Sequence, residues 1–102
     1  MKLFRFVIAC FLAVSLTHVA AADAASDLYK TKCQGCHGTD GHASAIGKKL
    51  GARDFSDPDV VKMSEADLVK VATDGKNKMP AYKGKLTEDQ IKGLVKYIKE
   101  MK

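Results

Sequence analysis

The chain has 102 residues, of which 17 are Lys or Arg and 12 are Asp or Glu, and its formal net charge is +5. Apolar residues make up 46% and charged residues 28%, with 8 Gly and 2 Pro. This length supports one small domain, and this composition excludes a collagen, a low-complexity linker, a disordered tail and a disulfide-dense toxin.

The first segment has the pattern of an export signal. Two basic residues precede an apolar run at 6–16, which is too short to span a bilayer, and small residues follow it. We expect cleavage after Ala22 or, as a second choice, after Ala24. Residues 1–22 are therefore assigned to a signal peptide and residues 23–102 to the mature domain. A retained N-terminal helical anchor is the alternative interpretation.

The mature domain needs a stabilising element besides its own core. Removing the signal and its two basic residues leaves 80 residues with 15 basic and 12 acidic groups, formally +3. A core of that size contributes only a few kcal/mol. A disulfide between Cys33 and Cys36 would close a loop of two intervening residues and add little.

Helical signals predict an all-α fold with three to four short helices and long loops. Residues 26–32 predict a short first helix. An approximate capping box at Ser64 begins a second helix that Gly75 ends, and a capping box at Thr87 begins the last helix. The apolar face of the last helix is formed by Ile91, Leu94, Val95 and Ile98. No strand-like alternation of useful length is present.

Two loops separate these helices. Gly, Asp and Pro interrupt the periodicity throughout residues 37–59, and a compact domain rarely tolerates such a loop unless it wraps something. The second loop, residues 76–82, contains Met79 followed by Pro80, whose ring fixes the backbone there.

The strongest motif is the C-x-x-C-H sequence from Cys33 through Cys36 to His37, which is typical of c-type haem attachment. Two thiols three positions apart can add to the two vinyl groups of one porphyrin, and the adjacent histidine can reach the iron from one side. A haem would also supply the large apolar body that an 80-residue domain lacks.

Other uses of paired cysteines fit this chain less well. A thioredoxin-type redox pair follows a strand, and we expect none before Cys33. A structural zinc site needs four ligands, typically from a second Cys/His pair. Besides His37 the mature chain has only His42, which lies in a glycine-rich loop where we expect it to be exposed.

Over residues 25–102 the chain resembles the class I c-type cytochromes, which are small monohaem electron carriers. The supporting features are the C-x-x-C-H motif, Met79-Pro80 in a late loop, Leu94 and Tyr97 on the last helix, and a short first helix bearing an aromatic residue. The resemblance implies a cytochrome c-like fold whose first and last helices cross. Ala25 and Tyr29 serve the crossing, and Ala25 is a mild departure from the family's usual Gly.

The resemblance also implies the cofactor and its ligands. Cys33 and Cys36 would attach one haem c, and His37 and Met79 would be the axial ligands of its iron. A ligand from a distant loop lets the chain fold over both haem faces, and a thioether raises the reduction potential. Met63, just before a helix cap, is the alternative to Met79.

Two details around the haem stay open at this stage. Relatives offer a proline carbonyl to the free N–H of the proximal histidine, whereas this chain has no proline there. We expect a backbone carbonyl near Ile46 or Gly47 to serve instead. Arg53 is either a partner of a haem propionate or a solvated loop cation.

The predicted function is a soluble periplasmic electron carrier and not an enzyme, because two filled axial sites leave the iron no open position. The thylakoid lumen and the extracellular side are alternative locations. A haem enzyme or gas sensor, and a module fixed in a larger complex, are the rival functions. We expect a monomer that has no membrane anchor and does not bind nucleic acid. Its partners would be larger redox proteins with acidic docking surfaces, met by four lysines: Lys76, Lys78, Lys83 and Lys85.

Overall fold

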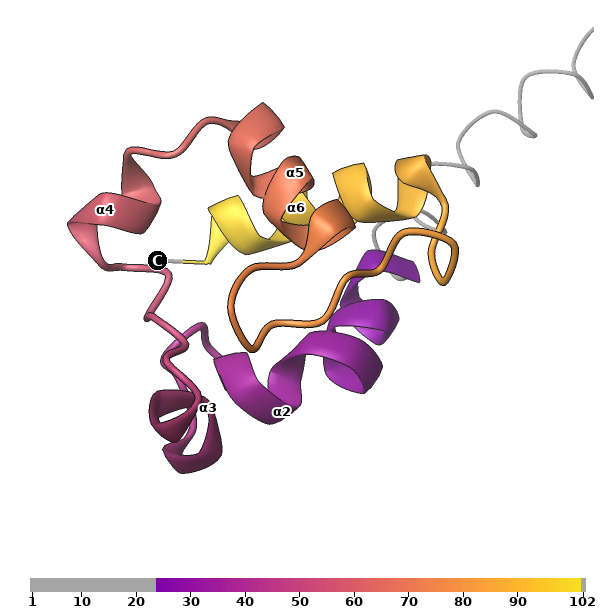
Figure 1. The fold of residues 1–102 in the computed structure, drawn as a ribbon. Coiled ribbons are helices and arrows are strands. Elements are labelled where there is room, and N and C mark those ends of the chain that lie inside the picture. The colour runs from indigo at the N-terminus through magenta and orange to yellow at the C-terminus, as the bar shows by residue number, and fades with distance from the viewer. Residues whose placement is uncertain (1–23, 102) are drawn as a thin grey trace, which may run out of the picture.

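The computed structural model describes residues 24–101, and these residues form an all-helical fold (Figure 1). Residues 24–28 are helical and continue without a break into the next elements. The elements in chain order are η1 (Tyr29–Cys33), α2 (Gln34–His37), α3 (Ala45–Lys49), α4 (Pro58–Val61), α5 (Glu65–Asp74) and α6 (Glu88–Glu100). The expected signal peptide lies outside the described residues. Within residues 24–101 no helix is long and apolar enough to cross a membrane.

Both predicted capping boxes are present and explain where the two longest helices begin. The Ser64 hydroxyl accepts the backbone N–H of Asp67, and the Asp67 carboxylate accepts that of Ser64. Thr87 and Gln90 form the same reciprocal pair at the start of α6. Gly75 ends α5 with φ of 76°, in the left-handed region that favours glycine.

The prediction of a continuous loop over residues 37–59 was wrong in part, because this stretch contains α3 and the beginning of α4. Each short helix has its own cap: Ser44 accepts the N–H of Gly47, and Asp57 accepts that of Asp59 with Pro58 in the first turn. The first helical stretch is also longer than predicted and extends through the C-x-x-C-H motif to His37.

The predicted crossing of the first and last helices is confirmed. Tyr29 is 1% exposed, and its ring centroid lies 5.4 Å from that of Tyr97 on α6. Gly93 faces the small side chain of Ala25, since a Cβ built at Gly93 would lie 4.0 Å from the Ala25 Cβ. Two small residues therefore let the helices approach closely, and two tyrosines fill the space beside them.

Replacing Tyr97 by Ala is expected to destabilise the fold by about 3 kcal/mol, since truncating a packed aromatic leaves a cavity beside Tyr29. Tyr97→Phe keeps the ring and is the matched control. Urea unfolding of the haem-loaded proteins measures the effect. An unfolding midpoint equal in Tyr97→Ala and wild type would show that the crossing does not depend on this ring.

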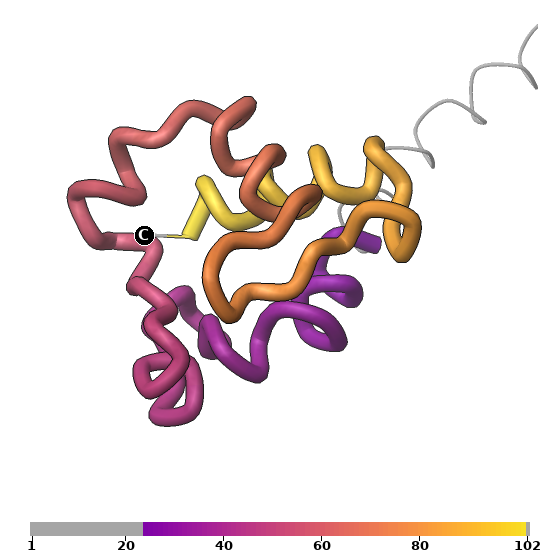
Figure 2. Tube along the Cα trace, viewed as in Figure 1, coloured from indigo at the N-terminus to yellow at the C-terminus, as the bar shows by residue number. Residues whose placement is uncertain are grey.

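The segment between α5 and α6, residues 75–87, crosses the molecule between α5 and the N-terminal helical stretch (Figure 2). Its backbone is anchored to α5, because the N–H groups of Tyr82 and Lys83 donate to the carbonyls of Ala72 and Thr73 at 3.0 and 3.1 Å. This anchorage fixes where the loop carries Met79.

Candidate functional site

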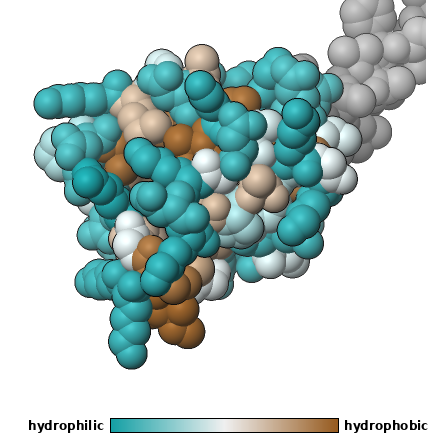
Figure 3. Space-filling model, viewed as in Figure 1, coloured by the Kyte–Doolittle hydropathy of each residue, from teal (hydrophilic) through white to brown (hydrophobic). Residues whose placement is uncertain are grey.

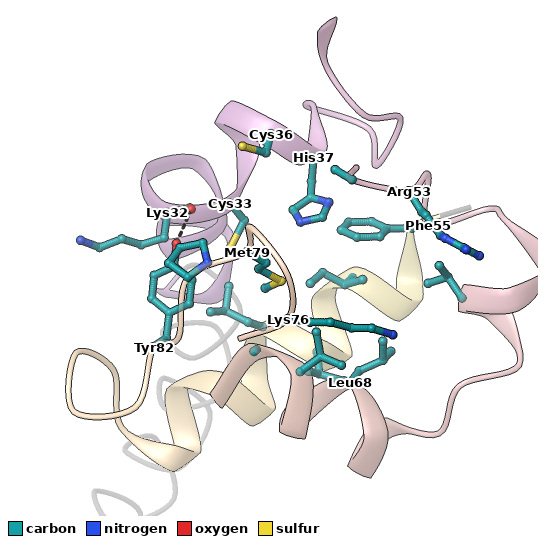
Figure 4. A pocket seen from close by; sticks show the side chains of 18 of the residues that line it. Lys32, Cys33, Cys36, His37, Arg53, Phe55, Leu68, Lys76, Met79 and Tyr82 are labelled. Carbon is teal, nitrogen blue, oxygen red and sulfur yellow. Dashed lines mark hydrogen bonds between the residues drawn. The ribbon is translucent and has the colours of Figure 1, made fainter. Parts of the chain in front are cut away.

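The four predicted site residues, Cys33, Cys36, His37 and Met79, line one cavity of about 570 Å³ (Figure 4). Its apolar walls come mainly from α5 and α6, through Leu68, Val71, Leu94, Val95 and Ile98. Figure 4 shows His37 entering from α2, with Met79 on the loop across the cavity. Residues 42 positions apart in the sequence thus meet in one space.

The helical backbone explains why the motif residues act together. Cys33 precedes α2, and Cys36 and His37 lie at its end, so they are three and four positions beyond Cys33. Residues at these spacings are neighbours on one helix face. Both thiols are free, with no disulfide between them within residues 24–101.

Helix α3 lies against the end of α2 by a close backbone approach. A Cβ at Gly47 would fall within the contact distance of the Cys36 carbonyl oxygen, so no other residue fits without a shift. The Ser44 hydroxyl donates to the Gly35 carbonyl at 2.7 Å, and the Ser44 N–H donates to Cys36 at 3.0 Å. These contacts fix the backbone of the C-x-x-C-H motif against α3.

Phe55, a residue that no sequence motif indicated, supports the His37 ring. The two rings stack with centroids 4.8 Å apart and planes 25° apart. The Phe55 N–H donates to the Gly41 carbonyl at 2.9 Å, and Gly41 has φ of 86°. The available signal was a lone aromatic residue in a polar, glycine-rich stretch.

The loop that carries Phe55 is held by Asp54. Its carboxylate accepts the Ala43 N–H at 2.7 Å and lies 3.5 Å from the His42 ring. The Ala43 hydrogen bond is the main cause that lowers the pKa of Asp54, with His42 adding to it. His42 is exposed, as expected.

The expected carbonyl partner of His37 is not found. His37 Nδ1 is buried and has no hydrogen-bond partner among the described residues. The Ile46 and Gly47 carbonyls instead accept N–H groups of Leu50 and Ala52 within and after α3. The expected acceptor near Ile46 or Gly47 is therefore not in place for His37 in the described residues.

Burial sets the protonation of the motif. It lowers the pKa of His37, so the imidazole is neutral at pH 7 and its lone pair is available to a metal. It raises the pKa of the Cys33 thiol to about 11. Redox-active C-x-x-C pairs have a lowered thiol pKa, so this site lacks their signature.

A structural zinc site also finds no support. In the described part of the chain, no group of three or more His, Cys, Asp or Glu side chains is placed to hold a metal ion. The remaining ligands near iron in a haem protein come from the porphyrin, so a haem iron needs only axial side chains.

The Met79 loop is tightly turned. The Met79 N–H donates to the Lys76 carbonyl at 2.9 Å, and Lys76 donates back at 3.2 Å. Asn77 within this turn has φ of 53°. A Cβ at Gly75 would lie 2.7 Å from the Met79 carbonyl oxygen. Met63 also lines the cavity and therefore remains the alternative ligand.

Charged side chains surround the cavity unevenly. Lys32, Lys76 and Lys78 line it, whereas Lys83 lines a second hollow beside the start of α6. Arg53 also lines the cavity, but its guanidinium donates to Asp59 at 2.8 Å.

Figure 3 shows apolar surface gathered over α3, where Ile46 and Leu50 are exposed.

The donor set and the cavity fit a covalently attached haem. The cavity volume lies within the range of small-molecule and cofactor sites, and its lining is largely apolar. Two free thiols, a neutral imidazole and a thioether reach this one space. Among residues 24–101 only six hydrophobic residues are buried, and the last three of them also line the cavity: Ala25, Tyr29, Ala43, Ile91, Leu94 and Val95.

Comparison with known proteins gives a consistent result. Residues 20–98 match the family described as "Cytochrome C oxidase, cbb3-type, subunit III". The chain is 30% identical to a cytochrome c6 from Gracilaria tenuistipitata var. liui, over 94% of this chain and 90% of that protein. It is 33% identical to a cytochrome c6 from Thermosynechococcus vestitus, over 92% and 88%. The solved structure of the KustC0563 c-type cytochrome superposes with a TM-score of 0.72 at 34% identity, covering 76% of this chain and 96% of that one.

Proposed function

Because this chain belongs to the cbb3-type subunit III family of small monohaem c-type cytochromes, we propose that Cys33 and Cys36 bind its haem and that His37 and Met79 ligate the iron. The chain is a cytochrome c6-like electron carrier and not an enzyme. A covalent haem c supplies reversible one-electron exchange between ferric and ferrous iron.

One observation carries the ligand assignment: the two thiols, the imidazole and the thioether line the same cavity. The helix supplies three of these groups from one face, and the loop after α5 supplies the fourth from across the space. Met79 is preferred over Met63 because its loop is pinned to α5 on both sides of the turn, at Gly75 and at Tyr82.

The residues around the proposed ligands keep their geometry fixed. Phe55 stacks on one face of the His37 ring and limits its rotation. The apolar side chains of α5 and α6 exclude water, which favours the less charged state of a buried redox centre. With His37 and Met79 both bound, the iron would have no vacant position for a substrate, in keeping with a carrier.

Export is part of the proposal. Residues 1–22 would direct the chain across the membrane, and residues 23–102 would carry the haem in the periplasm. The relatives named cytochrome c6 are matched over 88% or more of their length, which favours a self-contained carrier over a module fixed in a complex.

We further propose that lysines at the cavity mouth meet acidic redox partners. Of the four lysines expected from the sequence, Lys76 and Lys78 line the cavity, and Lys32 joins them. Lys83 lies at the second hollow. The patch that steers a partner is therefore centred on Lys32, Lys76 and Lys78.

Electron exchange with ferricyanide tests the carrier and its patch together. The rate is expected to fall as ionic strength rises, because salt screens the attraction between lysines and an anion over about 8 Å. Lys76→Glu with Lys78→Glu should slow exchange about tenfold at low salt. Stopped-flow oxidation of the ferrous protein gives these rates.

Lys70→Glu with Lys96→Glu is the matched control, because both lysines are exposed, neither lines the cavity, and the net charge changes equally. In this control the rate of electron exchange is expected to fall less than in Lys76→Glu with Lys78→Glu. Equal rates for the two double variants would mean that net charge, and not the patch, determines the exchange. A wild-type rate that is flat or rises with salt would remove the patch from the proposal.

A further inference from the structure

The helix that carries the attachment motif changes its hydrogen-bond register just before the motif. The Gln34 N–H donates to the Tyr29 carbonyl five residues back, at the end of η1. The Gly38 N–H then donates to the Gln34 carbonyl four residues back, at 2.9 Å. Between these two bonds, the four carbonyls of residues 30–33 face only the three N–H groups of residues 35–37. One carbonyl therefore needs a donor from elsewhere.

Tyr82 supplies that donor from the other side of the cavity. Its hydroxyl donates to the Lys32 carbonyl at 2.9 Å across 50 residues of sequence (Figure 4). Lys32 immediately precedes Cys33, so the bond reaches the backbone one residue before the motif begins. The π-helical turn thus leaves the Lys32 carbonyl without a donor from its own helix, and Tyr82 on the Met79 loop provides one.

The backbone of Tyr82 makes the bond more than a local contact. Its N–H donates to the Ala72 carbonyl on α5 at 3.0 Å, and its carbonyl accepts the N–H groups of Lys85 and Leu86. One residue therefore joins α5, the turn at 82–86 and the motif helix. Met79 lies three positions before it and is tied to Lys76 on its other side.

We propose that Tyr82 is a positioning residue, which keeps the Met79 loop closed over the cavity by fastening it to the Lys32 carbonyl. The inference rests on the proposed ligation by Met79. Release of the loop must break this hydrogen bond, and because the bond is exposed, water then replaces Tyr82 as the donor and only the net value of one hydrogen bond is lost. Opening the loop therefore costs more free energy than breaking the hydrogen bonds within its own turn.

The experiment measures how readily an added ligand displaces Met79. Imidazole is titrated into the ferric haem-loaded proteins, and binding is followed by optical absorption. Tyr82→Phe removes only the hydroxyl, and we expect it to bind imidazole about three- to tenfold more tightly than wild type, which is the range for losing one neutral hydrogen bond. Met79→Ala is included to report the affinity of an open site.

Tyr29→Phe is the matched control for a general loosening of the fold. Its hydroxyl also donates to a backbone carbonyl, that of Gly38 at 2.6 Å, but this bond does not reach the Met79 loop. The imidazole affinity of Tyr29→Phe is expected to stay within about twofold of that of wild type.

The outcomes separate this inference from the proposed function. If Met79→Ala binds imidazole no more tightly than wild type, Met79 is not a ligand and both proposals fail. If Met79→Ala opens the site while Tyr82→Phe matches wild type, the ligation stands and the positioning role is wrong. If the imidazole affinity rises equally in Tyr82→Phe and Tyr29→Phe, the effect is a general loosening of the fold and the positioning role is again wrong.

Discussion

Met79→Ala is expected to convert a closed haem site into an open one. The ferrous variant should bind carbon monoxide readily at neutral pH, whereas wild type should bind it poorly, because alanine cannot reach the iron. The reduction potential should also fall by about 0.1 V or more, since a thioether raises it and axial ligands tune haem potentials over about 0.8 V. Carbon monoxide difference spectra and a redox titration measure the two effects.

Met63→Ala provides the matched control for this variant. Met63 also lines the cavity, but it immediately precedes the cap of α5. Its removal should enlarge the cavity without opening the iron, so carbon monoxide binding should stay near that of wild type. An open site in Met63→Ala and a closed one in Met79→Ala would exchange the roles of the two methionines.

Removing both attachment points is expected to prevent folding. Without the haem, the cavity of about 570 Å³ would collapse or fill with water. Either outcome removes apolar contacts that the haem would make, and a small domain has only about 5–15 kcal/mol of stability to lose. Cys33→Ser with Cys36→Ser should therefore lack haem and most of its helical circular dichroism.

The single variants Cys33→Ser and Cys36→Ser are the controls, because each retains one thiol for attachment. We expect each to keep haem and helical content, with a lower unfolding midpoint than wild type. A double variant with native helical content would show that the chain folds on its six-residue core alone, and the haem would then not be the stabilising element that the sequence requires.

Local patterns were sufficient to predict the parts of this fold that depend on neighbouring residues. The capping boxes at Ser64 and Thr87 need only residues three positions apart, and both formed. The C-x-x-C-H motif was recognised from its spacing alone, although the helix that carries it extends further than the sequence predicted. The family pattern then placed Tyr29 near Tyr97.

The features that escaped prediction depend on contacts between distant segments. Phe55 stacks on His37 only because Gly41 and Asp54 shape the loop between them, and no local period signals this. Whether a carbonyl reaches His37 depends on how α3 packs against α2, and in the described residues none does. The bond from Tyr82 to Lys32 depends on a π-helical turn that sequence periodicity does not reveal.

The central claim is that the cavity holds a haem bound through both thiols of the motif. Wild-type protein is denatured and extracted with acidified organic solvent, and the intact mass of the remaining chain is then measured. We expect the colour to stay with the protein and the mass of the chain to exceed that of the mature polypeptide by one haem. Haem that leaves with the solvent, and a chain of bare polypeptide mass, would contradict it.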